Sequence, residues 1–130
     1  MNTDWISQIK RGTLEYAVLL LINKCDRYGY DLIQTLNKYT MLNTNESTIY
    51  PLLRRLMKNG YLESYWQNIE EGTPPRKYYR ITKSGTLYLD KLKCDWCKLI
   101  ENINDIEKEW YWYERCREKE WYWHERCRNK

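Results

Sequence analysis

The sequence predicts a mainly helical α+β fold, in which three helices and a two-stranded hairpin precede one long final helix. Apolar residues recur every three or four positions in several stretches, which is the spacing of helices with one buried face. Two short aromatic stretches, separated by a loop that contains Gly and Pro, predict the hairpin. Apolar residues then continue at alternating spacings of three and four through residues 89–113, a pattern typical of a helix that packs on another helix.

Length and composition predict a single domain with an anionic partner. The chain has 130 residues and a net charge of +4, and the excess of Lys and Arg lies in residues 1–100. The acidic Asp4 argues against an export signal, and the longest apolar run, 17–22, is too short to span a membrane. We therefore expect a soluble cytoplasmic protein with no membrane partner, whose five cysteines are reduced thiols.

The first two helices are predicted at residues 11–23 and 28–38. The first is apolar on most sides after Thr13, which is a suitable cap. The second has apolar residues at the spacing of a buried face, namely Leu32, Ile33 and Leu36. A polar turn at residues 40–45 leads to a third helix, so the second and third helices form a candidate helix-turn-helix.

The third helix has one apolar and one basic face. The apolar stripe consists of Ile49, Leu52, Leu53 and Leu56, and the opposite face carries Ser47, Tyr50, Arg54 and Lys58. Because Pro51 lacks a backbone donor, the helix is predicted to start near Ser47 or Thr48, which places Pro51 in the first turn. Asn59 and Gly60 are predicted to end it.

The hairpin, predicted at residues 61–66 and 76–82, brings further cations beside this helix. A basic helix next to a hairpin arm can enter a DNA groove, although a helix with one basic face is more often only a solvated surface. The side chains predicted to contact DNA are Asn45, Ser47, Thr48, Tyr50, Arg54, Lys58, Arg76, Lys77 and Tyr78. Arg54 has the fork for a guanine contact, whereas Lys58 and Lys77 suit phosphates.

The final helix, capped by Thr82, carries a seam of apolar residues that continues to Trp110 and Tyr113. We predict a homodimer through this seam, although a long helix could also pack back on its own domain. A helix of this length would extend beyond so small a body, which favours self-association. The predicted interface residues are Leu89, Leu92, Trp96, Leu99, Ile103 and Ile106.

Trp96 is also a candidate ligand-binding residue. In a symmetric dimer it can approach its own mate, and two facing indoles make a slot for a planar aromatic molecule. The alternative is that Trp96 only fills the interface.

The C-terminus is an internal duplication. Residues 109–119 recur as 120–130 with nine of eleven positions identical. An eleven-residue period fits a continuing helix, so the tail is predicted to extend the final helix. Its aromatic side chains also suit contact with apolar surface or a flat molecule.

Four segments together resemble the PadR family of bacterial transcriptional regulators: residues 12–14 (Gly-Thr-Leu), 28–32 (Tyr-Gly-Tyr-Asp-Leu), 47–56 (Ser-Thr-Ile-Tyr-Pro-Leu-Leu-Arg-Arg-Leu) and 75–82 (Pro-Arg-Lys-Tyr-Tyr-Arg-Ile-Thr). The resemblance covers residues 10–105. It implies a winged helix-turn-helix domain at 1–82 and a C-terminal dimerisation helix at 83–108. The duplicated tail at 109–130 departs from the family pattern and is assigned from the repeat alone.

The resemblance further implies a regulator, usually a repressor, that binds a pseudo-palindromic site in double-stranded DNA as a homodimer and needs no cofactor. The short C-terminal part is similar to a smaller subgroup, some members of which bind flat aromatic compounds in the dimer interface. The wing tip departs from the pattern, because Glu70 and Glu71 should repel phosphate.

The alternatives to DNA binding are a metal or thiol site, an enzyme and a protein-interaction module. Cys94 and Cys97 have metal-ligand spacing, as do His124 and Cys127, but a zinc site needs four ligands in one place, so no metal is predicted. A thiol-responsive regulator remains an alternative. The single His has no nucleophile setting and there is no Gly-rich phosphate loop, so the chain is not expected to be an enzyme. A winged-helix protein-interaction module is the third alternative.

Overall fold

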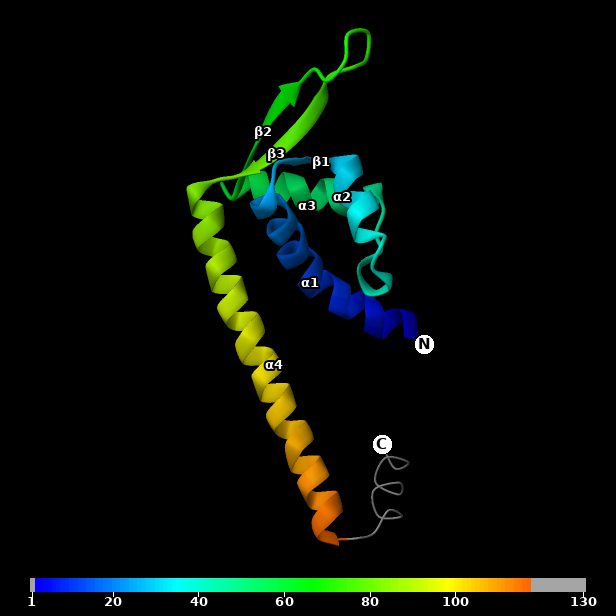
Figure 1. The fold of residues 1–130 in the computed structure, drawn as a ribbon, viewed down its shortest axis with the longest axis vertical. Coiled ribbons are helices and arrows are strands. Elements are labelled where there is room, and N and C mark those ends of the chain that lie inside the picture. Colours follow the sequence, from blue (N-terminus) through cyan, green and yellow to red (C-terminus); the bar gives the residue numbers. More distant parts are fainter. Residues whose placement is uncertain (1, 118–130) are drawn as a thin grey trace. The chain divides into compact units, whose positions relative to one another are not determined.

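The computed structural model describes the backbone of residues 2–117 and the side chains of residues 5–109. The chain forms two compact units, Met1–Lys93 and Cys94–Lys130. The first unit holds all the strands and the second begins within the last helix (Figure 1). In chain order the elements are α1 (Asn2–Lys24), β1 (Arg27–Tyr28), α2 (Gly29–Leu36), the 3₁₀ turn η1 (Thr40–Leu42), α3 (Glu46–Lys58), β2 (Leu62–Gln67), β3 (Arg76–Ile81) and α4 (Lys83–Arg117).

The helices of the first unit enclose one hydrophobic core, as the sequence periodicity predicts. Both predicted apolar faces are buried: Leu32, Ile33 and Leu36 on α2, and Ile49, Leu52, Leu53 and Leu56 on α3. Leu14, Val18, Leu19 and Ile22 of α1 complete the helical part of this core. Leu62 of β2, Tyr79 of β3 and Leu89 of α4 join it, so the hairpin base and the start of α4 pack on the same core.

The sheet is antiparallel with the strand order β1-β3-β2. In the hairpin, Tyr65 lies opposite Tyr78 and Trp66 opposite Lys77. Strand β1 pairs only two residues with β3, so the outer half of the hairpin has no third strand and projects past the helices of the first unit (Figure 1). The sequence did not predict β1, because two residues are too few to show an alternating pattern. The second helix was consequently predicted to begin one residue early, at Tyr28 rather than Gly29.

Helix α1 begins at Asn2, so the predicted start at Arg11 was wrong. Thr13 is not an N-cap. Its hydroxyl donates to the carbonyl oxygen of Ile9 at 2.8 Å, one turn earlier in the same helix. A threonine can make this bond inside a helix, so residue type alone does not mark the helix start.

Helix α3 begins at Glu46, slightly earlier than the predicted Ser47 or Thr48. Asn45 is the N-cap, and its side chain accepts a hydrogen bond from the backbone N–H of Thr48 at 3.2 Å. Pro51 therefore lies inside the helix rather than in its first turn. Its ring is exposed, and the missing donor costs the helix only one backbone bond.

The end of α3 is closed by Gly60, as predicted. Gly60 has φ +80°, a conformation that favours glycine. The backbone N–H of Gly60 donates to the carbonyl of Met57 at 3.0 Å, and that of Tyr61 to the carbonyl of Leu56 at 2.9 Å. This pair of bonds is a Schellman cap, which turns the chain sharply into β2.

Thr82 caps α4, as predicted, and joins it to the turn after α3. Its hydroxyl accepts from the N–H of Gly85 at 3.0 Å and donates to the carbonyl of Gly60 at 2.6 Å. The rings of Tyr61 and Tyr88 stack with centroids 4.1 Å apart. The hydroxyl of Tyr88 also reaches Glu15 of α1 at 3.1 Å. The first turns of α4 are therefore attached to the end of α3 and to α1.

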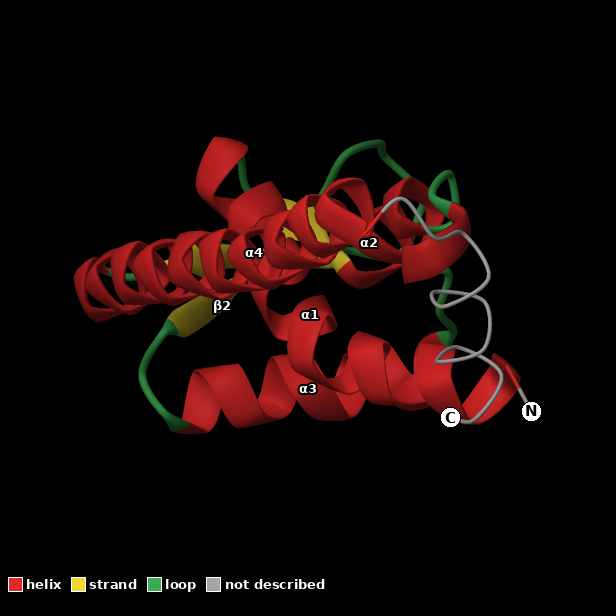
Figure 2. Cartoon of the chain, turned by 90° about the horizontal axis from the view of Figure 1, so that it is seen from below, coloured by secondary structure: helices red, strands yellow, loops and turns green. Residues whose placement is uncertain are grey.

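Helices make up most of the described chain, and none of those in the described range has the length and apolar character needed to cross a membrane (Figure 2). Helix α4 continues into the first copy of the duplicated tail and is helical to Arg117. Residues 118–130, which hold the rest of the predicted helix extension, lie outside the described residues.

The contact of Gly85 with the turn after α3 predicts a strong effect of one methyl group. A Cβ at Gly85 would lie 2.1 Å from the backbone carbonyl oxygen of Tyr61. Gly85→Ala should therefore lower the free energy of unfolding by about 1–3 kcal/mol, because the backbone must shift to make room. Urea denaturation followed by circular dichroism measures this change.

Gly12→Ala is the matched control. Nothing lies within 4 Å of a Cβ at Gly12, which is in the exposed interior of α1. Alanine there should be neutral or stabilising, by up to about 1 kcal/mol. Equal stability of Gly85→Ala and the wild type would contradict the close packing at this junction.

Candidate nucleic-acid interface

The exposed face of α3 presents most of the side chains predicted to bind DNA. Thr48, Arg54 and Lys58 are exposed, and Tyr50 is half-buried. At the N-terminus, the Ser47 hydroxyl donates to the side-chain oxygen of Asn45 at 2.6 Å, and the same oxygen caps the helix. Both side chains are exposed, so they can start the helix and still face a partner.

A pocket of about 410 Å³ lies beside this helix, in the first unit. It is bounded by the start of α2, the exposed face of α3 and the outer part of the hairpin. Four predicted DNA-contacting residues meet there: Tyr50, Arg54, Arg76 and Lys77. The pocket is completed by residues that sequence reasoning did not assign to the site, namely Tyr28, Gly29, Tyr30, Trp66 and Tyr79.

The cations of the pocket rest on aromatic rings. The guanidinium of Arg76 lies 4.6 Å from the ring centre of Tyr28. The ammonium of Lys77 lies 6.0 Å from the ring of Trp66 and 5.9 Å from that of Tyr79. Ring faces attract cations without neutralising their charge. The arrangement holds both side chains at the pocket without pairing them with an acid.

No acidic residue lines this pocket, which distinguishes its cations from other arginines of the same unit. Arg27 pairs with Asp31 at 3.1 Å, Arg55 with Glu15 at 3.4 Å and Arg80 with Glu63 at 2.8 Å. Among the side chains that the structure describes, no ion pair involves Arg54, Arg76 or Lys77. The pocket therefore presents uncompensated positive charge.

Two residues that sequence reasoning missed shape the wall of the pocket. Gly29 allows the ring of Tyr50 to lie against the start of α2, since a Cβ at Gly29 would come within 2.6 Å of that ring. Tyr79 is buried behind it, and burial raises the pKa of its phenol, while the nearby Arg54 acts in the opposite direction. Tyr79 is therefore a neutral hydrogen-bonding group at physiological pH. Gly29 lies in the motif at residues 28–32, and this motif was the feature of the sequence that could have assigned Gly29 to the site.

Tyr78 does not line the pocket, in contrast to its neighbour Lys77. Its ring packs on other tyrosines instead. The ring of Tyr78 lies 5.4 Å from that of Tyr28 and 5.8 Å from that of Tyr65. The Tyr65 hydroxyl in turn donates to Asp26 at 2.6 Å, and this bond raises the pKa of Tyr65. Tyr78 thus belongs to a row of tyrosines that braces the hairpin.

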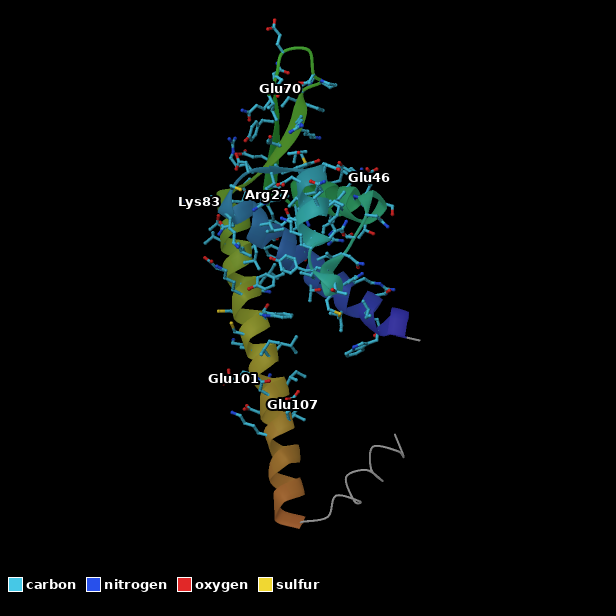
Figure 3. The ribbon with its side chains drawn as sticks, turned by 45° about the vertical axis from the view of Figure 1, so that its right-hand side comes forward. Arg27, Glu46, Glu70, Lys83, Glu101 and Glu107 are labelled. Carbon is cyan, nitrogen blue, oxygen red and sulfur yellow. The ribbon has the colours of Figure 1, made fainter. Side chains whose placement is uncertain are left out.

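The tip of the hairpin is acidic, as the sequence shows. Glu70 lies at the far end of the hairpin loop (Figure 3). The loop turns through Gly72, whose φ is +89°, and the N–H of Thr73 donates to the carbonyl of Glu70 at 3.3 Å. Glu71 lies in the same exposed turn. Negative charge at the tip and positive charge at the pocket favour anion binding near α3 rather than at the end of the hairpin.

The predicted seam on α4 divides into a buried and an exposed part. Leu89 is 1% exposed and Leu92 packs against the same core, so both contact their own unit. Leu89 is therefore covered by its own unit. In the second unit, by contrast, Trp96, Leu99, Ile103 and Ile106 are between 37% and 57% exposed, and Ile100 beside them is 40% exposed. Glu101 and Glu107 mark the same stretch of helix (Figure 3).

The predicted thiols of α4, Cys94 and Cys97, are free and exposed, as is Cys25. Within the described part of the chain, no group of three or more His, Cys, Asp and Glu side chains is arranged to hold a metal ion. His124 and Cys127 lie outside the described residues.

A family model described as "Transcriptional regulator PadR-like family" matches residues 18–91. A curated protein of Lysinibacillus sphaericus, named only as uncharacterized protein X, is 38% identical over 100 residues, which are 75% of this chain and 91% of that protein.

Solved structures of PadR-family regulators are also similar to this chain. A PadR family transcriptional regulator from Eggerthella lenta is similar with a TM-score of 0.71 and 34% identity, over 80% of this chain and 89% of the other. A PadR-like transcription factor from Bacteroides fragilis is similar with a TM-score of 0.65 and 39% identity, over 82% of this chain and 99% of the other.

Proposed function

The chain belongs to the PadR-like family of transcriptional regulators, and we propose that it represses transcription by binding a pseudo-palindromic operator as a homodimer. The observation that carries the DNA-binding part is the exposed polar and basic face of α3 beside a pocket that holds three cations and no acid. Such a regulator acts in the cytoplasm, where the chromosome is.

In this proposal α3 is the recognition helix and lies in the major groove. Arg54 faces outward from α3 and has the length and the fork for a bidentate guanine contact. Asn45, Ser47 and Thr48, at the N-terminus of the helix, are short polar side chains suited to base edges. Lys58 and Lys77 are assigned to phosphates, which position the protein without reading sequence.

A protein-interaction module is the competing function. A winged helix that binds another protein would need an apolar or mixed surface at its center of contact. The surface beside α3 instead concentrates positive charge with no acidic residue in its pocket, and its exposed rings, Tyr30 and Trp66, lie beside those cations. This favours a polyanion over a protein partner.

Two substitutions separate base reading from phosphate contact. Arg54→Ala should cost about 1–3 kcal/mol in operator binding and relax the sequence preference, because it removes a base contact. Lys77→Ala should weaken binding to all sequences alike and reduce the salt slope by about one. Fluorescence anisotropy with an operator selected from a random pool, at several salt concentrations, measures both effects.

Arg80→Ala is the control, since Arg80 lies on the same strand as Lys77 but pairs with Glu63. It should leave operator binding nearly unchanged. If Arg54→Ala binds the selected operator as tightly as the wild type, α3 is not the recognition helix.

The dimer is proposed to form through the exposed apolar residues of α4 in the second unit. Four seam residues and Ile100 form a contiguous apolar stripe, and exposed stripes of this kind mark interaction sites. The three-and-four spacing fits a second copy of the same helix. The two recognition helices would then contact half-sites about one DNA turn apart, or a multiple of it.

Leu99→Glu combined with Ile103→Glu should dissociate the dimer, because two charges would be buried in the seam. Sedimentation velocity at micromolar concentration distinguishes monomer from dimer. Lys98→Glu, at the exposed position just before Leu99, is the control for added negative charge. A wild-type monomer that binds the operator fully would refute the proposed assembly.

The ligand part of the proposal concerns Trp96. Two copies of this indole facing each other across the dimer axis would hold a planar aromatic molecule, and its binding would release the operator. The half-exposed indole at the start of the stripe supports this placement. A ligand regulates only if it binds the DNA-competent and the incompetent form unequally.

Planar cationic dyes and flavins should quench tryptophan fluorescence of the wild type and not of Trp96→Leu. The chain has seven tryptophans, and truncation after Lys108 removes four of them, so the truncated protein must be compared as well. Quenching that survives Trp96→Leu but disappears on truncation would assign binding to the tail instead.

A further inference from the structure

We propose that the pocket beside α3 holds one specific phosphate of the DNA backbone. This inference rests on the proposed DNA-binding function and concerns the same surface. It differs from a diffuse basic face, because it assigns one anionic group to one hollow. The walls of that pocket come from five elements: the end of β1, the start of α2, α3, β2 and β3.

The charges around the hollow match a phosphate. Arg76 and Lys77 reach the pocket from β3, and Arg54 of α3, whose fork is assigned to a guanine, adds its positive charge at the same pocket. None of them is neutralised by a carboxylate, and Arg76 and Lys77 are steadied by aromatic rings at 4.6 Å and 6.0 Å. Like charges that share one pocket repel one another, and an anion bound there removes that repulsion. Hydrogen bonds between such cations and a phosphate are among the stronger ones in proteins.

The start of α2 contributes to the same pocket through Tyr28, Gly29 and Tyr30. Tyr28 is the N-cap, and it makes no side-chain capping bond. The first N–H groups of a helix lack partners within the helix, and the positive end of the helix dipole favours an anion. The one acid in this first turn, Asp31, is held by Arg27 at 3.1 Å. The field at this side of the pocket therefore has the same sign as that of the three cations.

The wall of the pocket has a built shape. The ring and hydroxyl of Tyr50 occupy the space that a side chain at residue 29 would need. This places a phenol next to the start of α2, in the same pocket as Arg54. A methyl group at Gly29 would displace the Tyr50 ring without altering any charge. The geometry of the pocket and its charge can thus be changed separately.

In this assignment the hairpin contacts the DNA backbone through the residues that line the pocket, Arg76 and Lys77, and not through the loop at its tip. The acidic tip with Glu70 and Glu71 stays away from phosphate. A phosphate held between α3 and β3 would fix the depth and register of the recognition helix in the groove, because phosphate contacts orient a protein on the duplex.

Neutral methylphosphonate groups, placed one at a time along the selected operator, provide the test. The wild-type protein should show one position in each half-site where this replacement weakens binding about tenfold or more, as expected for losing hydrogen bonds to a charged group. In the double variant Arg76→Ala with Lys77→Ala, the same replacement should cost little, since the partners are already absent.

Gly29→Ala tests the shape of the pocket with its charges intact. It should lower affinity for unmodified DNA and shrink the penalty at the same position, with Gly12→Ala and Arg80→Ala as controls that behave like the wild type. Circular dichroism confirms folding, and the charge variant gives its answer even if Gly29→Ala does not fold.

Equal penalties in the wild type and the double variant at every position would overturn the phosphate assignment. So would a wild type that tolerates every replacement. If the wild type bound no duplex in the selection, the proposed function itself would fail, and this outcome is distinct from the other two.

Discussion

The packing of Gly85 against the backbone of Tyr61 is the constraint on which the rest of the first unit depends. At this point the turn after α3, the base of the hairpin and the first turn of α4 come together. Thr82 bonds to both Gly60 and Gly85, and the stacked rings of Tyr61 and Tyr88 cover the junction. Since α3 ends here and α4 begins here, neither of these two ends can be displaced without disturbing the other.

Five arginines of the first unit, all except Arg11, fall into two groups: three are paired with acids and two line the pocket. Those paired with acids connect elements: Arg55 joins α3 to Glu15 of α1, and Arg80 joins the two hairpin strands through Glu63. Exposed pairs of this kind add little to stability, so their main effect is to keep these cations from acting elsewhere. Arg54 and Arg76 have no such acid and line the pocket. Pairing with an acid thus decides which of these cations remain available to an anionic partner. The outcome differs even between neighbours, since Arg55 is paired and Arg54 is not.

Much of this organisation was predictable from local patterns. The buried faces of α2 and α3, the cap at Thr82 and the glycine that ends α3 follow from spacing and residue type. Errors arose where one residue type serves two purposes: Thr13 bonds within a helix as readily as it caps one, and Pro51 is tolerated further into α3 than its chemistry suggests. The pocket was only half predicted. Its cations stand out in the sequence, but Gly29, Trp66 and Tyr79 join them through tertiary packing, which no local pattern reveals.

Helix α4 shows the same limit in a different form. A repeat of apolar residues every three or four positions indicates that one face of the helix is covered, but it does not identify the surface that covers it. Leu89 and Leu92 are covered by their own unit, whereas the residues from Trp96 onward continue the identical spacing with much of their surface exposed. The division between the two units, after Lys93, falls where this change occurs. One unbroken pattern therefore encodes two environments in succession. The residues before the division are covered by the core of their own unit. The exposed residues after it match the proposed dimer, in which a second copy of the same stripe would cover them.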